Sequence, residues 1–188
     1  MPRLIRPANI SDAAALIAYM QELSAEPEID ILFEPGEFQC TVEQEEEFLR
    51  GYAEAENSVF LVAVQDSQIV GCLSAEGGRL RSLRHVVCLG ISVRREQRNQ
   101  GIGTQLMTAA LDWAVATGII RRIELQVLAR NLRAIHLYRR FGFENEGSKR
   151  NAVCRLGQMH DVCMMAKLIE VRVESTRPAP APLAHSSR

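Results

Sequence analysis

The sequence lacks the features that mark a membrane, secreted or metal-binding protein. No apolar run is long enough to cross a bilayer, and the stretch from Met1 to Arg6 has no hydrophobic core of a signal peptide. The five cysteines include no Cys-x-x-Cys pair, and their odd number is typical of reduced intracellular thiols. We therefore expect a cytoplasmic protein with no membrane contact and no metal centre, in which Cys72 and Cys88 pack in the core.

Aromatic residues are scarce and positive charge is unevenly placed. Aromatics make up only 5% of the chain, so the arginines between Arg79 and Arg122 lack the interleaved rings of a nucleic-acid platform, and no nucleic acid is expected as a partner. Lysine and arginine are absent between Asp12 and Glu47, where eleven acidic residues lie, whereas 20 of the 22 basic residues fall in 50–188. This asymmetry fits a solvated acidic face, and it also fits separate surfaces for an anionic and a cationic ligand.

The chain does contain a regular succession of strand and helix patterns. Helices are predicted after Asn9, Thr41, Gly101 and Asn131, and strands at 4–6, 59–64, 69–73, 86–93, 123–127, 143–148 and 161–169. The order β-α-α-β-β-β-α-β-α-β-β predicts one mixed α/β domain over 1–170. A tail rich in Pro, Ala and Ser follows at 171–188, and we expect it to be disordered.

The motif that points to chemistry is the glycine loop from Arg98 to Gly103, which follows a strand and opens a helix. The first amides of a helix have no internal acceptor and lie at the positive end of the helix dipole, so glycines there let a phosphate approach. Arg98, with Arg94 and Arg95, adds positive charge. The lysine of a Walker loop and the third glycine of a Rossmann loop are missing, and a plain helix start is the alternative.

Two blocks in order carry a family resemblance. Arg98-Asn-Gln-Gly101-Ile-Gly103 resembles the Arg/Gln-x-x-Gly-x-Gly/Ala motif of the GNAT superfamily of acyl-CoA N-acyltransferases, and the block from Asn131 to Phe143 resembles its second motif. The resemblance covers nearly everything except the tail. It implies a central, mostly antiparallel twisted sheet of about seven strands with about four helices, and an N-acetyltransferase with acetyl-CoA as its cosubstrate.

The resemblance also implies roles for single residues. Ile91 and Val93 pair through their backbone with the pantetheine arm, Asn131 hydrogen-bonds that arm, and Tyr138 lies near the sulfur. Tyr138 would protonate the leaving thiolate as general acid, and its alternative role is that of a core aromatic. The pyrophosphate is held by Arg98 and by the amides of Asn99, Gln100, Gly101, Ile102, Gly103 and Thr104.

The general base is marked less clearly. Gln126 stands five residues before Asn131, where the branch that acetylates ribosomal proteins carries a glutamate. Glu124 lies two residues earlier and on the same sheet face as Gln126, so it is the candidate base, although it can instead pair with an arginine. His85 at the start of a strand and a chain of waters are further alternatives.

The acceptor is predicted from the acidic segment. In the superfamily the two N-terminal helices and their loop form one wall of the acceptor site, and here that loop, 26–37, carries Glu34 and Glu37. Because carboxylates attract ammonium groups, we expect a cationic small molecule or a basic peptide N-terminus to bind there. The alternative is that these carboxylates only solvate the loop.

Two other functions stay open at this level. One is a protein N-terminal or lysine acetyltransferase, and the other is a non-catalytic module that binds acyl-CoA through the glycine loop. The presence of both Asn131 and Tyr138 favours an enzyme. The patterns at 147–150 and 161–165 resemble bacterial small-amine and antibiotic acetyltransferases, whose last strands often build a homodimer, and this leaves a homodimer as one option.

Overall fold

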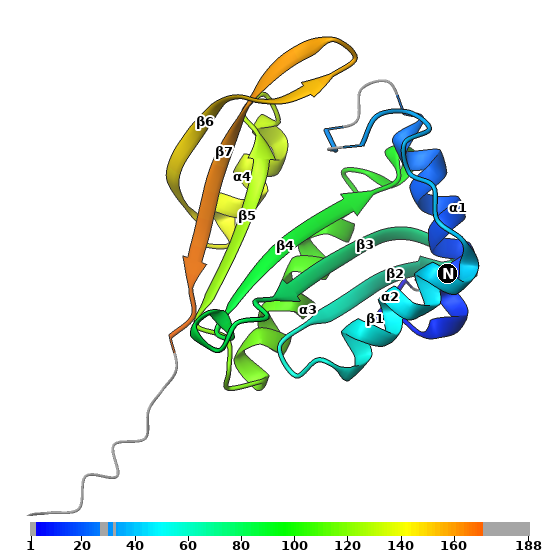
Figure 1. The fold of residues 1–188 in the computed structure, drawn as a ribbon, viewed down its shortest axis with the longest axis horizontal. Helices are drawn as coiled ribbons and strands as arrows, with labels where there is room; N and C mark the ends of the chain where they lie inside the picture. Colours follow the sequence, from blue (N-terminus) through cyan, green and yellow to red (C-terminus); the bar gives the residue numbers. More distant parts are fainter. Residues whose placement is uncertain (1–2, 27–29, 32, 171–188) are drawn as a thin grey trace, which may run out of the picture.

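The protein is built around one seven-stranded sheet (Figure 1), seen in a computed structural model that describes residues 3–26, 30–31 and 33–170. The spatial order is β1-β2-β3-β4-β5-β7-β6, and every neighbouring pair is antiparallel except β4 and β5. This confirms the predicted mixed, mostly antiparallel α/β fold. The strands are β1 (Leu4–Pro7), β2 (Val59–Gln65), β3 (Gln68–Gly77), β4 (Val86–Val93), β5 (Arg122–Leu128), β6 (Glu144–Arg155) and β7 (Gln158–Leu168).

Helices cover both faces of this sheet. In Figure 1, α1 (Ala13–Ser24) and α2 (Val42–Glu54) lie in front of β1 to β3, while α3 (Ile102–Ala116) and α4 (Leu132–Arg140) lie behind. Because side chains alternate along a strand, each inner strand serves two cores. Leu73 of β3 belongs to the core shared with α3 and α4, and the adjacent Cys72 belongs to the core shared with α1 and α2.

Local signals set the helix ends. Thr41 and Gln44 form the expected capping box at the start of α2. Asn131 accepts a hydrogen bond from the Ala134 amide at 3.0 Å and so caps α4. Gly118, with φ +62°, follows the end of α3. The last two of these signals set the ends of α4 and α3, the helices that border the candidate site.

The parallel pair β4 and β5 is joined at one end only. The two strands pair at Val86 to Cys88 and Arg122 to Glu124, and beyond these three rungs they diverge (Figure 1). We call the resulting gap the wedge, and its closed end, at the rung Cys88–Glu124, the vertex. Parting of the strands leaves the backbone of β4 after Cys88 without a strand partner on that side, since β5 pairs with β7 instead.

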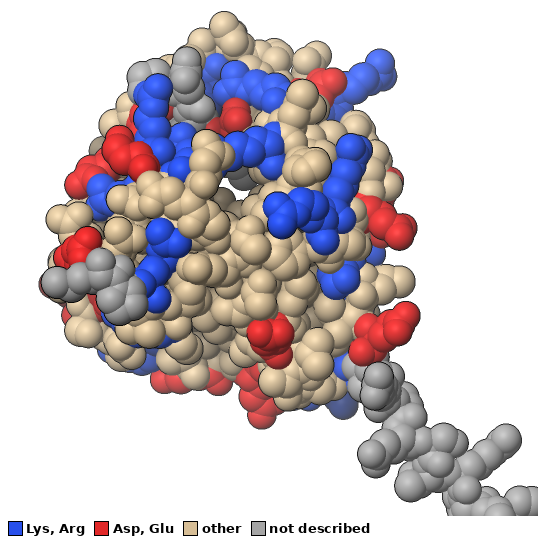
Figure 2. Space-filling view, turned by 180° about the vertical axis from the view of Figure 1, so that it is seen from behind, with Lys and Arg blue, Asp and Glu red and all other residues tan. Residues whose placement is uncertain are grey.

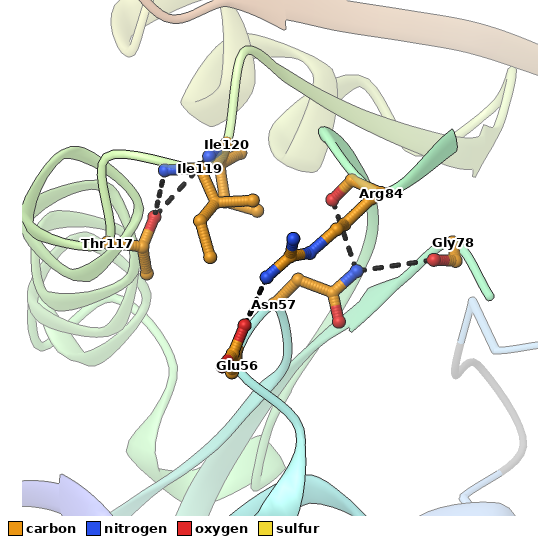
Figure 3. A network of polar contacts seen from close by, with 7 residues as sticks. All are labelled: Glu56, Asn57, Gly78, Arg84, Thr117, Ile119 and Ile120. Atoms are coloured by element: carbon orange, nitrogen blue, oxygen red, sulfur yellow. Dashed lines mark hydrogen bonds and ion pairs between the residues drawn. The ribbon is translucent and has the colours of Figure 1, made fainter. Parts of the chain in front are cut away.

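A polar network fixes the region below the vertex (Figure 3). The Asn57 amide nitrogen donates to the carbonyl oxygens of Gly78 at 3.2 Å and Arg84 at 3.1 Å, and this ties the start of β2 to the turn that leads into β4. Glu56 pairs with the Arg84 side chain, and the Thr117 hydroxyl accepts from the amides that precede β5. The closed end of the wedge is therefore braced, and the open end is where the strands separate.

Some sequence-based details were wrong. The strand predicted at 143–148 extends over 144–155, because β6 is an exposed edge strand defined by its pairing with β7 and not by apolar residues. Cys72 is buried as expected, but Cys88 is exposed. Its neighbours Val87 and Leu89 face the core, so Cys88 points to the opposite face, which α1 and α2 do not cover there. The predicted tail, 171–188, lies outside the described residues.

Within the part of the chain that the structure describes, no helix is long and apolar enough to span a membrane.

Candidate active site

The glycine loop presents a row of free backbone donors. The Arg98 amide bonds to the Arg95 carbonyl, and the Gln105 amide makes the first bond inside α3, to the Gly101 carbonyl. Between them, the amides from Asn99 to Thr104 have no acceptor among the described residues. Donors gathered at a helix N-terminus form a site for an anion such as a phosphate. The stretch singled out in the sequence thus offers donors for an anion, and its role in holding the pyrophosphate stays a prediction.

Two glycines shape this loop for different reasons. Gly101 adopts a left-handed backbone, with φ +81°, in open space, so its role is conformational. A Cβ at Gly103 would lie 3.3 Å from Cδ2 of Leu137 and 3.9 Å from Cδ1 of Ile91. Gly103 therefore lets the start of α3 approach α4 and β4 at the open end of the wedge. The start of α3, α4 and β4 therefore meet at this point.

Positive side chains gather on the same face of the molecule. Figure 2 shows Lys and Arg gathered around a hollow on the face that carries α3 and α4. Arg98 donates from Nε to the Val93 carbonyl at 3.0 Å and pairs with Glu26, so its guanidinium ties the loop to β4 and to the segment that follows α1. Burial lowers the pKa of Arg133, and the positive charge of Arg98 lowers it further. Because the Arg98 guanidinium is engaged with Val93 and Glu26, we expect it to attract an anion through its positive charge. The hydrogen bonds to the anion would come from the free backbone amides.

Tyr138 lies on α4 beside the wedge and is almost fully buried, with 6% of its surface exposed. Its ring packs against Phe143 at a centroid distance of 5.9 Å. Burial raises the pKa of Tyr138 to about 12, so the phenol stays protonated at neutral pH. Its hydroxyl has no hydrogen-bond partner within 3–26, 30–31 and 33–170, which leaves it ready to donate to an incoming group.

The opposite face of the wedge carries the candidate base. Cys88 and Glu124 form the last rung before the strands part, and both side chains lie on the face away from α3. Two adjoining hollows share Cys88, Arg122 and Glu124. One extends toward Gln126 and Glu146, and the other toward Glu76 and His85. Glu124 and Gln126 face the same side, as the period of the strand predicts.

Glu124 is held by an arginine, the alternative that the sequence left open for it. Arg122 Nε donates to Glu124 Oε2 at 2.9 Å, and the two terminal nitrogens of Arg122 donate to Glu146. Surrounding protein atoms, followed by the negative charges of Glu124 and Glu76, raise the pKa of the Cys88 thiol. The vertex therefore combines a neutral thiol with carboxylates on both sides of it.

Comparison with known proteins agrees with this geometry. The acetyltransferase (GNAT) family model matches residues 18–143. The chain is 32% identical over 108 residues to the L-amino acid N-acetyltransferase AaaT of Escherichia coli (strain K12), over 57% of this chain and 67% of that protein. An acetyltransferase of the GNAT family from Streptococcus pneumoniae is 34% identical, with a TM-score of 0.86 over 90% of this chain and all of that one. The ribosomal-protein-alanine N-acetyltransferase from Brucella melitensis is 26% identical, with a TM-score of 0.77 over 88% of this chain and 99% of that one.

The chain belongs to the GNAT acetyltransferase family. It is therefore an N-acetyltransferase that depends on acetyl-CoA, as the two sequence motifs implied. In this family member the wedge offers an unpaired strand edge, and the adjoining glycine loop offers free amides.

The acidic loop of this GNAT protein is held by hydrogen bonds that its sequence did not predict. Glu34 Oε1 accepts from the Leu156 amide at 2.7 Å, so it docks the loop on the hairpin between β6 and β7. Glu37 Oε2 accepts from the Glu34 amide at 2.8 Å. Arg155, which is buried, donates to the Phe33 carbonyl at 3.2 Å. One oxygen of each glutamate is thus engaged with the backbone, at the open end of the wedge.

Two residues near the vertex were not identified from the sequence. Glu146 reaches Arg122 from β6, and Glu76 enters the second hollow from β3. Neither lies in a motif, and both are brought to Glu124 by strand pairing alone, so no local signal was available for them. No group of three or more metal-ligating side chains occurs among the residues described.

Proposed function

We propose that the protein transfers an acetyl group from acetyl-CoA to the primary amine of a small molecule, through direct attack in a ternary complex. The observation that carries the proposal is the parting of β4 and β5 beside the free amides from Asn99 to Thr104. A strand edge without a partner inside a domain leaves backbone groups to be satisfied by a ligand. The wedge supplies such an edge along Leu89 to Val93.

In the proposed complex the pyrophosphate occupies the amides of the glycine loop, and the pantetheine arm pairs with the backbone of Ile91 and Val93. From Val93 back to Cys88 the strand spans about 16 Å at ~3.3 Å per residue, and the arm runs along it toward the vertex. The side-chain oxygen of Asn131 accepts the hydrogen bond that caps α4, so the side-chain nitrogen is the group left to bond to the arm. The thioester then lies where the strands meet.

The chemistry follows from the groups at the vertex. The neutral amine attacks the thioester carbon from the face of Glu124, and a backbone amide of β4 stabilises the oxyanion. Glu124 accepts the proton that the amine loses. Collapse of the intermediate breaks the carbon–sulfur bond, and Tyr138 donates its proton to the CoA thiolate. Bound in an apolar site, the phenol is neutral before this step, as its pKa of about 12 requires.

Two observations support the proposed class of acceptor. The similarity to a protein named as an L-amino acid N-acetyltransferase favours a small α-amine. The acidic segment that includes Glu34 and Glu37 favours an amine that carries positive charge. We therefore propose a small amino compound of that kind, and we retain cytoplasmic location and a homodimer through the last strands as predictions.

The test is release of CoA thiol from acetyl-CoA, with the acetylated product identified by mass spectrometry. The acceptor panel contains neutral and basic amino acids, polyamines, and peptides with an N-terminal alanine. Turnover with one small-amine class supports the proposal and names the class. Turnover confined to peptides replaces it with an N-terminal acetyltransferase, the activity named in the Brucella relative. Tight acetyl-CoA binding without turnover on any acceptor contradicts it.

A further inference from the structure

Three charged side chains at the vertex form one network. Arg122 precedes Glu124 by two residues on β5, so both lie on the same face of the sheet. Its Nη1 donates to Glu146 Oε1 at 2.8 Å and its Nη2 donates to the other oxygen of Glu146, whereas only Nε reaches Glu124, at 2.9 Å. Glu146 therefore takes the two-pronged contact and Glu124 takes the single one.

This division of contacts decides what Glu124 can still do. An arginine and a carboxylate bind each other most strongly through two parallel hydrogen bonds. The two-pronged contact with Glu146 fixes the orientation of the guanidinium, and in that orientation only Nε of Arg122 reaches Glu124. Oxygen Oε1 of Glu124 has no hydrogen-bond partner in the described part of the chain, and the residue borders both hollows.

The charges of the network point the same way. Two carboxylates share one guanidinium, so the network carries one net negative charge. Arg122 holds the pKa of Glu146 below its usual range, which keeps Glu146 charged and in place. The side chain of Glu124 is 44% exposed, on the side from which an amine can approach. A free, negatively charged oxygen at the vertex suits an ammonium group or the proton that it loses.

We propose that Glu146, acting through Arg122, is a positioning residue that keeps one oxygen of Glu124 open to the acceptor amine. The inference rests on the proposed function, because it takes Glu124 as the group that meets the amine. Removal of the Glu146 carboxylate frees the terminal nitrogens of Arg122. Arg122 then turns to Glu124 and occupies both of its oxygens, and the acceptor loses its contact.

The experiment compares Glu124→Gln, Glu146→Gln and the double variant in steady-state kinetics. Glu124→Gln lowers kcat/KM for the acceptor by about 10²-fold or more, the range for loss of a general base. Glu146→Gln lowers it about tenfold, the effect of one hydrogen bond to a charged group, with KM for acetyl-CoA unchanged. The double variant is no slower than Glu124→Gln, because Glu146 acts only through Glu124. Glu146→Asp, which keeps the carboxylate, restores most of the activity.

Glu47→Gln is the matched control, since Glu47 also pairs with a partly exposed arginine, Arg50, but lies on α2 away from the vertex. It retains wild-type kinetics. A Glu146→Gln variant with wild-type kcat/KM, or a double variant in which the two losses multiply, overturns the positioning role alone. Wild-type kinetics for Glu124→Gln overturns the base assignment in the proposed function, and the positioning role with it. Thermal melting of each variant separates these outcomes from loss of folding.

Discussion

The two sides of the wedge are built in different ways. On the side proposed for the cofactor, the donors are consecutive backbone amides from Asn99 to Thr104, and the strand edge is the backbone of β4. On the side proposed for the acceptor, the groups are side chains from separate strands, Glu76 on β3, Glu124 on β5 and Glu146 on β6. The first is specified by one short segment of sequence, and the second by the pairing of distant strands.

This difference bears on how such a protein can change its substrate. A backbone site tolerates replacement of most side chains, provided that the glycines keep the chain in its shape. A site of side chains on paired strands changes its preference with single substitutions, because each carboxylate contributes its own charge and contact. The comparison therefore predicts that variants on the two sides affect different kinetic constants.

The largest effect is expected from Tyr138, which lies on α4 in the core that α3 and α4 share with the sheet. Tyr138→Phe should lower kcat by about 10²- to 10⁴-fold, the usual contribution of a general acid, with little change in KM for either substrate. Because the hydroxyl has no partner within the described ranges, its loss leaves no group unpaired, and the melting temperature should stay near that of the wild type. A kcat within a few-fold of the wild type would remove Tyr138 from the mechanism.

The next effect isolates the cofactor side. At φ +81° a β-branched side chain costs about 1–2 kcal/mol, so Gly101→Val should raise KM for acetyl-CoA about tenfold and leave KM for the amine unchanged. Gly118→Val is the control, because Gly118 has φ +62° at the far end of the same helix, also in open space. It should lose stability without losing acetyl-CoA affinity. Equal kinetic effects of the two variants would contradict the loop assignment.

The first part of this comparison could be predicted from the sequence, and the second could not. The glycine loop and the Asn131 cap depend on neighbours within a few residues, so their residue types and spacing were sufficient. Glu146 lies 22 residues from Glu124 in the chain, and only the pairing of β5, β7 and β6 brings it near. Its strand is exposed and polar, so hydrophobic alternation predicted only the first part of β6.

Cys88 shows a second reason for error. Its apolar neighbours suggested burial, but alternation along β4 puts Val87 and Leu89 in the core and Cys88 on the other face. Whether that face is covered depends on where α1 and α2 end across the sheet. No pattern inside the strand contains that information, because it comes from the packing of separate elements.

A smaller effect tests the acceptor side through charge alone. Glu34→Gln with Glu37→Gln keeps an oxygen acceptor for each observed backbone bond, so the loop should stay docked. Loss of two charges at about 10 Å in water should raise KM for a cationic amine about fourfold at low salt. The difference should vanish in 1 M salt, and KM for a neutral amine should not respond. An unchanged KM at low salt would leave these carboxylates with a structural role only.

The smallest effect on activity is expected from a pair that serves neither side. Arg6 binds Asp12 through two bonds, at 2.7 and 2.8 Å, and the Asn9 amide adds a third. These bonds hold the pKa of Asp12 below its usual value of 3.8. Asp12→Asn should reduce the free energy of unfolding by about 1–2 kcal/mol near pH 7 and leave kcat and both KM values unchanged.

The lowered pKa of Asp12 also predicts how this loss of stability depends on pH. Because the folded state favours the charged carboxylate, the stabilisation is present above pH 3.8 and is lost as pH falls through the lowered pKa of Asp12. Urea unfolding of both proteins at pH 7 and below pH 3 should therefore show a gap that closes in acid. A gap that persists in acid would assign the loss to packing.

The short pairing of β4 with β5 also bears on aggregation. A strand edge with free donors and acceptors is a template on which another chain can add itself, and proteins usually protect such edges with charge, bulges or covering elements. Here the free edge of β4 runs beside β5, which is joined to it at the vertex, and α3 and α4 lie behind the sheet (Figure 1). A second chain that paired with this edge would have to enter between two strands that are already joined at one end. The geometry proposed to admit the cofactor thus also hinders the edge from recruiting a second chain.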